Sequence, residues 1–181
     1  MSKIVVTEFL SLDGVMEEPF PWTSPYWNDE IAKFKRDELF TAGAHLLGRI
    51  TYEGFAAAWP GRTDEQGFAD RMNSLPKYVV STTLKKADWQ NSHIISANIA
   101  PEIARLKQVP GQDILVAGSA TLVNTLINQD LVDELHLLVY PVILGTGKHL
   151  FSNGNKASLK LAEAKYFSSG VVLLRYQQDI H

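Results

Sequence analysis

Short apolar runs alternate with amphipathic stretches along this chain. The apolar runs have the length of buried strands and occupy residues 4–10, 45–47, 78–80, 93–95, 114–117 and 135–140. Between them, apolar side chains recur with helical spacing, which predicts helices at residues 25–41, 49–59, 64–75, 99–109 and 120–128. Residues 159–167 and 171–176 have strand composition and are separated by the short turn 168–170. They predict an antiparallel hairpin near the end of the chain.

Strands that alternate with helices, followed by a hairpin, are typical of an α/β protein. We therefore expect a three-layer fold with a mostly parallel central sheet and an antiparallel edge formed by the C-terminal hairpin. The chain has 181 residues, and it contains no internal repeat and no long linker. That length suits one hydrophobic core, so residues 1–181 are expected to form a single domain. In such a sheet, ligands bind at the carboxyl ends of the strands.

The stretch 114–151 contains a strand, the Gly118-Ser119 turn, a helix and a second strand. A unit of this kind places the helix N-terminus at the edge of the sheet. The free N–H groups and the positive end of the helix dipole can bind a phosphate there. An ordinary crossover, in which the glycine only permits a sharp turn, is an equally good interpretation of this stretch alone.

Two other segments place side chains that can bind a ligand at the same edge of the sheet. Gly48 precedes a second predicted helix, where Thr51 offers a hydroxyl and Arg49 offers a planar fork that fits phosphate oxygens. After the strand 78–80, hydroxyl side chains follow one another at Ser81, Thr82 and Thr83. They can bond a phosphate or a ribose. The alternatives are a surface arginine at an ordinary turn and a hydroxyl-rich turn without a ligand.

The segment 17–25 contains three prolines and is predicted to be a loop, with aromatic residues at 20, 22, 26 and 27. These rings can form the floor of a ligand pocket, a hydrophobic lid or a subunit contact. Ser24 is predicted to cap the next helix, with Pro25 at its first position. Glu30 borders the apolar face of this helix, where partial loss of water would raise its pKa and suit proton transfer. A solvated surface charge is the commoner situation for such a carboxylate.

Composition excludes several classes of function. The net charge is -3, so the chain presents no broad basic surface for nucleic acid. The absence of cysteine removes disulfides, thiolate metal sites and cysteine nucleophiles, and it fits a reducing compartment. No apolar run reaches membrane-spanning length, and the N-terminus has the pattern of a strand rather than of a signal peptide. We therefore expect a cytoplasmic protein without a membrane or nucleic-acid partner. The five histidines show no ligand spacing, so no metal is expected.

Five motifs carry a resemblance to a known family. In chain order they are SLDG at 11–14, LLGRITYE at 46–53, VVST at 79–82, ILVAGS at 114–119 and LVDELHLLVYPVILGTGKHLF at 131–151. Together they resemble the dihydrofolate reductase-like superfamily, and within it the reductase domain of the riboflavin-pathway deaminase/reductase. The resemblance covers essentially the whole chain and implies NADPH as cofactor. The deaminase part of the bifunctional enzyme has no counterpart in these residues.

The resemblance also implies a set of cofactor-binding residues. Arg49 and Thr51, with the adjoining Gly48 and Ile50, would hold the pyrophosphate or the 2′-phosphate, and the hydroxyl cluster would lie at the adenosine end. The residues expected to cover the pyrophosphate are Gly118, Ser119, Ala120, Thr121 and Leu122. Gly118-Ser119 stands where many members have Gly-Gly.

Two acids are expected to line the substrate pocket. Asp13 ends the first strand, and Glu30 precedes Phe34 by four residues, as the pocket acid precedes an aromatic residue in true dihydrofolate reductases. One of them would orient the substrate or relay a proton. The expected reaction is a riboflavin-type reduction of a ribosylaminopyrimidine; the alternatives are reduction of dihydrofolate or another pterin, and nucleotide binding without turnover. A homodimer is expected from the resemblance and from the apolar surface of the run 135–142 together with the aromatic residues of the loop.

Overall fold

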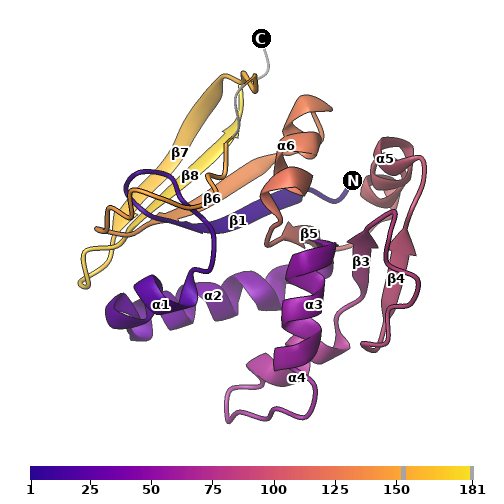
Figure 1. Cartoon of the computed structure of the whole chain (residues 1–181), viewed down its shortest axis with the longest axis horizontal. Helices are drawn as coiled ribbons and strands as arrows, with labels where there is room; N and C mark the ends of the chain where they lie inside the picture. The colour runs from indigo at the N-terminus through magenta and orange to yellow at the C-terminus, as the bar shows by residue number, and fades with distance from the viewer. Residues whose placement is uncertain (152–153, 180–181) are drawn as a thin grey trace.

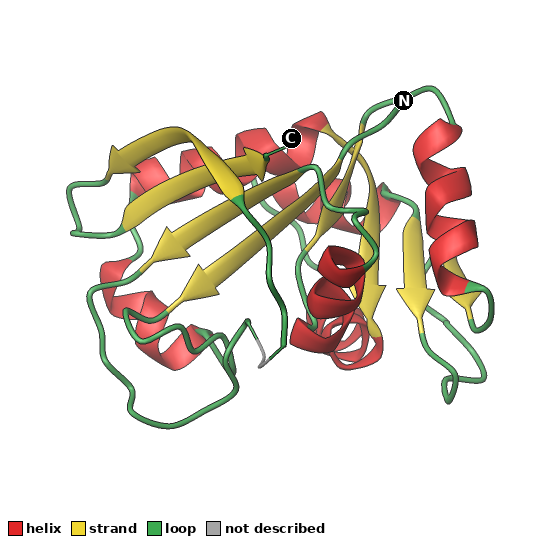
Figure 2. Cartoon of the chain, turned by 90° about the horizontal axis from the view of Figure 1, so that it is seen from above, coloured by secondary structure: helices red, strands yellow, loops and turns green. Residues whose placement is uncertain are grey.

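The computed structural model describes residues 1–151 and 154–179, so His181 lies outside the described part. Its strands are β1 (Ile4–Leu10), β2 (Ala42–Gly48), β3 (Lys77–Val80), β4 (Ser92–Ile95), β5 (Asp113–Val116), β6 (Glu134–Val139), β7 (Leu159–Tyr166) and β8 (Val172–Gln178). They form one sheet in the order β4-β3-β2-β5-β1-β6-β8-β7. All neighbours from β4 to β6 are parallel, whereas β8 runs antiparallel to both β6 and β7. The predicted sheet and its C-terminal hairpin are confirmed (Figures 1 and 2).

The helical segments are α1 (Phe20–Thr23), the 3-10 turn η1 (Ser24–Tyr26), α2 (Asp29–Thr41), α3 (Arg49–Ala58), α4 (Phe68–Ser74), α5 (Ile99–Gln108) and α6 (Ala120–Asn128). Side chains of α5 and α6 pack in one apolar cluster with one face of the sheet. Side chains of α2, α3 and α4 pack in two clusters on the other face. Helices therefore cover both faces, which gives the three layers predicted from the alternating pattern.

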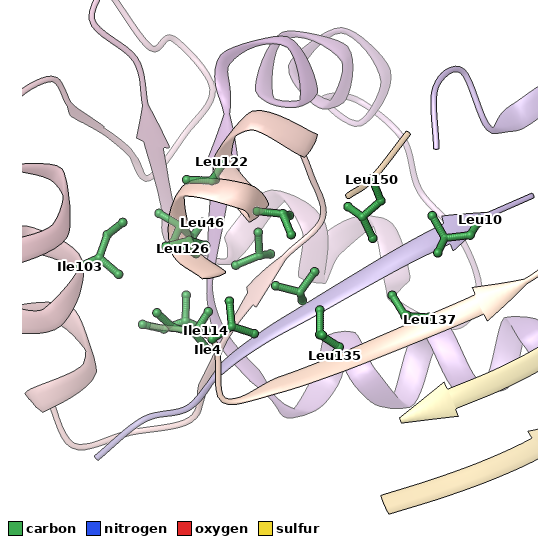
Figure 3. Packing of buried hydrophobic residues seen from close by; sticks show 14 of the residues in the cluster. Ile4, Leu10, Leu46, Ile103, Ile114, Leu122, Leu126, Leu135, Leu137 and Leu150 are labelled. Atoms are coloured by element: carbon green, nitrogen blue, oxygen red, sulfur yellow. The ribbon is translucent and has the colours of Figure 1, made fainter. Parts of the chain in front are cut away.

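Strand β1 lies in the middle of the sheet, and its side chains alternate between the two helical layers. Ile4, Val6 and Leu10 are buried in the cluster with α5 and α6, whereas Val5 is buried in a cluster with α2 and α3. Figure 3 shows the first cluster, with Leu122 and other side chains of α6 close to the sheet. Because both faces of β1 are covered, its sequence is a nearly continuous apolar run.

Helix α2 begins at Asp29, four residues after the predicted start at Pro25. Ser24 cannot cap a helix from residue 25, because its hydroxyl donates to the Phe20 carbonyl oxygen at 2.6 Å and closes α1 instead. Asn28 is the true N-cap, and its Oδ1 accepts from the Ile31 N–H at 3.0 Å. The segment predicted to be a loop, 17–25, therefore contains a short helix and part of a 3-10 turn.

The aromatic side chains of this segment pack mainly on the protein itself. Trp22 and Tyr26 meet the buried Tyr140 edge to face, with ring centroids 5.6 Å and 6.1 Å away. Phe20 is 80% exposed. Most of the aromatic cluster thus closes the core beneath the end of β6, and only its outermost rings remain available for another molecule.

The apolar run 135–142 does not supply surface for a subunit contact, contrary to expectation. Strand β6 lies between β1 and β8, and Leu135, Leu137 and Leu138 are buried. Strand β7 is one of the two edge strands of the sheet, and all its residues are exposed. The exposed apolar side chains of the sheet are therefore on β7.

Candidate functional site

Two glycine turns meet at the carboxyl edge of the parallel strands. Gly48 ends β2 and Gly118 follows β5, and the Gly48 N–H donates to the Gly118 carbonyl oxygen at 3.1 Å. A Cβ atom at Gly48 would lie 2.5 Å from Ser119 Oγ, and one at Gly118 would lie 2.9 Å from Thr51 Oγ1. Both turns therefore exclude a side chain at these positions, and Gly118 also has a φ of 97° that favours glycine. Neighbouring strands thus bring two helix starts side by side.

The starts of α3 and α6 present backbone N–H groups at this edge. Ser119 caps α6, and its Oγ accepts from the Leu122 N–H at 3.3 Å. The N–H groups of Ala120 and Thr121, in the first turn, have no partner within the helix. The side chains of Ala120 and Leu122 are buried in the core, and the Leu122 N–H is engaged by the cap, so Ala120 can serve a ligand only through its backbone N–H. Ser119 stands where the resemblance implies a second glycine, and in this chain it caps α6.

Arg49 adds a cation at the first position of α3. Its guanidinium is about half exposed and donates through Nη1 to Glu53 Oε2 at 2.9 Å, one helical turn further on. Ile50 is exposed beside it, and Thr51 is partly buried against Gly118. The sequence predicted that Arg49 lies at this edge, but it did not predict the ion pair between Arg49 and Glu53.

The hydroxyl cluster lies one strand further along the same edge. It follows β3, which neighbours β2 on the side away from β5. Ser81 is buried, and its Oγ accepts from the N–H groups of Thr83 and Leu84 at 3.2 and 2.9 Å, so this hydroxyl holds the turn together. Thr82 and Thr83 are exposed. The hydroxyl cluster after β3, the Gly48 turn after β2 and the Gly118 turn after β5 therefore follow one another along this edge.

Asp13 lies in the turn after β1 and anchors a distant segment. Its carboxylate accepts from Ser11 Oγ at 2.6 Å and from the N–H groups of Leu144 and Gly145 at 3.1 and 2.8 Å. These bonds, that of Ser11 first, lower the pKa of Asp13 to about 2. The group is therefore an anion at neutral pH and suits an orienting role better than donation of a proton.

Glu30 lies in the first turn of α2 and is exposed, so the expected partial loss of water at this carboxylate is wrong. Its Oε2 accepts from the N–H and the Oγ of Ser168 at 2.7 and 3.2 Å. Ser168 belongs to the turn between β7 and β8. Glu30 therefore connects α2 to the C-terminal hairpin, a contact that only the tertiary fold creates.

Glu8 is an acid in this region that the sequence reasoning missed. It lies in β1 and is 7% exposed, and its Oε1 has no hydrogen-bond partner among the described residues. A Cβ atom at Gly118 would lie 3.7 Å from that oxygen. The available signal was a carboxylate within a mostly apolar strand, but the sequence does not show which turn it would face.

A second buried polar group lies on the opposite face of β1. Glu38 of α2 accepts from Thr7 Oγ1 at 3.0 Å and is 2.6 Å from His136 Nδ1, and it forms an ion pair with Lys35. Burial alone would raise the pKa of Glu38, but Lys35 and His136 lower it to about 2. This carboxylate is therefore charged and fully partnered, in contrast to Glu8.

The described residues contain no group of three or more His, Asp or Glu side chains placed to hold a metal ion. Within the same part of the chain, no helix is long and apolar enough to cross a membrane.

Two bacterial proteins are similar in sequence. YwjB of Bacillus subtilis (strain 168) is 39% identical over 177 residues, which cover 94% of this chain and 95% of YwjB. YyaP of the same organism is 38% identical over 135 residues, 72% of this chain and 71% of YyaP. Both are named as uncharacterized proteins.

Three solved structures share the fold. A pyrimidine reductase-like protein of Corynebacterium diphtheriae has a TM-score of 0.70 at 13% identity, covering 99% of this chain and 93% of that one. The dihydrofolate reductase of Enterococcus faecalis, complexed with NADP(H), has a TM-score of 0.67 at 14% identity, covering 98% and 97%. A deaminase/5-amino-6-(5-phosphoribosylamino)uracil reductase of Thermotoga maritima has a TM-score of 0.68 at 15% identity, covering 98% of this chain and 57% of that longer one.

The profile of the RibD C-terminal domain matches residues 2–173, nearly the whole chain. The match agrees with the resemblance carried by the five motifs, which is thereby confirmed. The chain belongs to the RibD C-terminal domain family, and it has the fold of a dihydrofolate reductase.

Proposed function

We propose that this protein is an NADPH-dependent reductase that delivers hydride to a carbon–nitrogen or carbon–oxygen double bond of a ribosylaminopyrimidine. The observation that carries the proposal is the hydrogen-bonded pair of glycine turns at Gly48 and Gly118. Each begins a helix at the carboxyl edge of adjacent parallel strands, where helix N-termini bind phosphates. Family membership and the NADP(H) bound by a dihydrofolate reductase of the same fold support the choice of cofactor.

The chain's own residues fit such a cofactor. A side chain at either glycine would clash with the other turn, so the two glycines allow the starts of α3 and α6 to lie together. The first N–H groups of both helices are then available to a pyrophosphate bound at this edge. Arg49 would bind a phosphate after release or sharing of Glu53, and Thr82 and Thr83 offer exposed hydroxyls for the adenosine end. When bound, NADPH supplies the hydride, while the protein supplies position and electrostatics.

Reduction of a ribosylaminopyrimidine is favoured over pterin reduction by the position of Glu30. The resemblance to true dihydrofolate reductases assigns their pocket acid to the position of Glu30. Here the corresponding carboxylate is exposed and engaged by Ser168. Strong reduction of dihydrofolate would therefore contradict this choice.

The function is tested by the loss of NADPH absorbance with two probes, 5-amino-6-(5-phosphoribosylamino)uracil and 7,8-dihydrofolate. We expect NADPH oxidation with the first probe and little with the second. NADPH binding by calorimetry without oxidation of either probe would instead support a nucleotide-binding protein without turnover. Gly118→Ala is the matched variant: its Cβ would meet Thr51, so it should weaken NADPH binding, whereas Gly54→Ala, whose Cβ meets nothing within 4 Å, should not.

A further inference from the structure

Glu8 occupies an inward-facing position that is otherwise apolar along β1. The residues two before and two after it, Val6 and Leu10, are buried in the cluster with α5 and α6. Its partner in the parallel ladder with β6 is Leu137, which belongs to the same cluster. Figure 3 shows Leu10 and Leu137 lying along neighbouring strands on this face. A carboxyl group in such surroundings needs a specific reason, because burial of an acid without a partner destabilises the fold.

The end of β5 explains where this carboxyl points. β5 pairs with β1 only as far as Val116, which lies opposite Val6. Glu8 is the next position on the same face, at the level where β5 has given way to the Gly118 turn. A Cβ atom at Gly118 would lie 3.7 Å from Glu8 Oε1 and 3.5 Å from Met16 Cε. The unpartnered oxygen is therefore directed at the turn that joins the two helix starts.

The protonation of Glu8 differs from that of the other acids of this site. Burial raises the pKa of Glu8 to about 8, and the charges that act on it are Lys35, which lowers the value, and Glu38, which raises it further. Lys35 and Glu38 both lie on α2, on the opposite face of β1. At neutral pH Glu8 is therefore mostly a neutral acid with a proton to give, whereas Asp13 and Glu38 are anions.

We propose that Glu8 is the catalytic acid of this reductase and that its carboxyl group touches the substrate where β1 continues beyond the end of β5. The inference rests on the proposed function, because it needs a substrate bound beside this part of β1. Hydride adds to the carbon of the C=N or C=O bond, the π electrons move to the nitrogen or oxygen, and that atom takes the Glu8 proton. Glu8 is left as a carboxylate and regains a proton from water. The substrate class is a heterocycle or its ribosyl imine, with the acceptor atom in contact with a neutral carboxyl.

The test uses Glu8→Gln, which keeps the shape and neutrality of the protonated side chain but has no acidic proton. With 5-amino-6-(5-phosphoribosylamino)uracil as probe, its turnover should fall by about 10²-fold or more, the usual contribution of a general acid. NADPH affinity by calorimetry should stay at the parental value, which also shows that the variant is folded. The parental rate should fall as pH rises through about 8, and this limb should disappear in the variant. Glu65→Gln, at an exposed position, is the control and should change neither quantity.

A second measurement does not depend on turnover. In protein labelled with ¹³C at glutamate carboxyls, one resonance should titrate near pH 8 in the parent, vanish in Glu8→Gln and shift when NADPH binds. Absence of such a resonance, or indifference to NADPH, would overturn the inference.

The remaining outcomes separate the two proposals. Parental turnover in Glu8→Gln, or an equal loss in Glu30→Gln but not in Glu8→Gln, refutes the role of Glu8 and leaves the reductase standing. A parent protein that oxidises NADPH with neither probe refutes the proposed function, and the inference falls with it.

Discussion

Arg49 is the residue on which the proposed preference for NADPH over NADH depends. Arg49→Ala should weaken NADPH binding by about 2–3 kcal/mol, the range of a charge-assisted hydrogen bond, and should leave NADH binding nearly unchanged. Glu53→Gln should instead strengthen NADPH binding, because it frees the Arg49 guanidinium from its ion pair. Calorimetry with both cofactors measures these effects. Arg105→Ala removes another exposed arginine that pairs with a glutamate on its own helix, and serves as the control. Equal affinity of the parent for both cofactors would contradict the preference.

Glu8 also makes the stability of the fold depend on pH. Its pKa is raised from 4.5 to about 8 in the folded protein, so the folded state holds a proton that the unfolded state has lost between these values. This contribution to stability is therefore fully present below pH 4.5 and is lost as pH rises to about 8, by at most about 1.4 kcal/mol per pH unit. Urea unfolding across this window should show the decline in the parent and a flatter profile in Glu8→Gln. Identical profiles would mean that Glu8 is not protonated.

At the scale of elements, Asp13 holds the turn after β1 against the segment that follows β6. Main-chain bonds from Met16 to Lys148 and from Leu150 to Gly14 join the same two segments. Asp13→Ala should therefore raise hydrogen exchange at Leu144 and Gly145 while leaving β1 protected. Asp88→Ala, an exposed acid elsewhere, is the control. Unchanged exchange at both amides would show that the main-chain bonds suffice.

The hydrogen bonds of Asp13 to the Leu144 and Gly145 amides should also depend on pH. The pKa of Asp13 is lowered from 3.8 to about 2 in the folded protein, so its contribution is present above pH 3.8 and is lost as pH falls through about 2. The wild-type amides of Leu144 and Gly145 should lose protection in that acid range, and Asp13→Asn should remove the dependence. Exchange that does not follow acid titration in the parent would argue against the charge of Asp13 as the cause.

At the scale of the whole molecule, we expect a homodimer formed through β7. This edge strand carries Leu159, Leu161 and Tyr166, and Tyr166 is 81% exposed. An uncovered apolar edge invites pairing with another chain, and a stable interface buries on the order of 1,600 Å². Light scattering should give twice the chain mass at micromolar concentration, and Leu161→Lys should give a monomer. Val109→Lys, at an exposed apolar site at the end of α5, should leave the mass of the dimer unchanged. A monomeric parent would refute the expectation.

Most of the elements follow from local pattern, and their errors have local causes. The strands were located to within a few residues because their apolar runs are bounded by glycine, proline and polar turns. The start of α2 was wrong because Ser24 and Asn28 are both good caps, and the choice depends on which backbone groups their side chains reach. The start of α4 at Phe68 rather than at residue 64 has a similar cause. Asp64 lies before that helix and accepts from its first N–H groups.

The sequence by itself determined the α/β class, the two glycine turns and the arginine beside one of them, since each depends on residues within a few positions of one another. Only the tertiary structure decided that β2 and β5 are neighbours, so that Gly48 and Gly118 meet. It also gave the three acids different environments. Glu30 is exposed because the hairpin brings Ser168 to it, and Asp13 is anchored by a segment more than a hundred residues away. Glu8 is buried beside Gly118 because β5 ends before it. The state of a carboxyl group depends on the water and hydrogen bonds around it, and chain segments distant in sequence supply both.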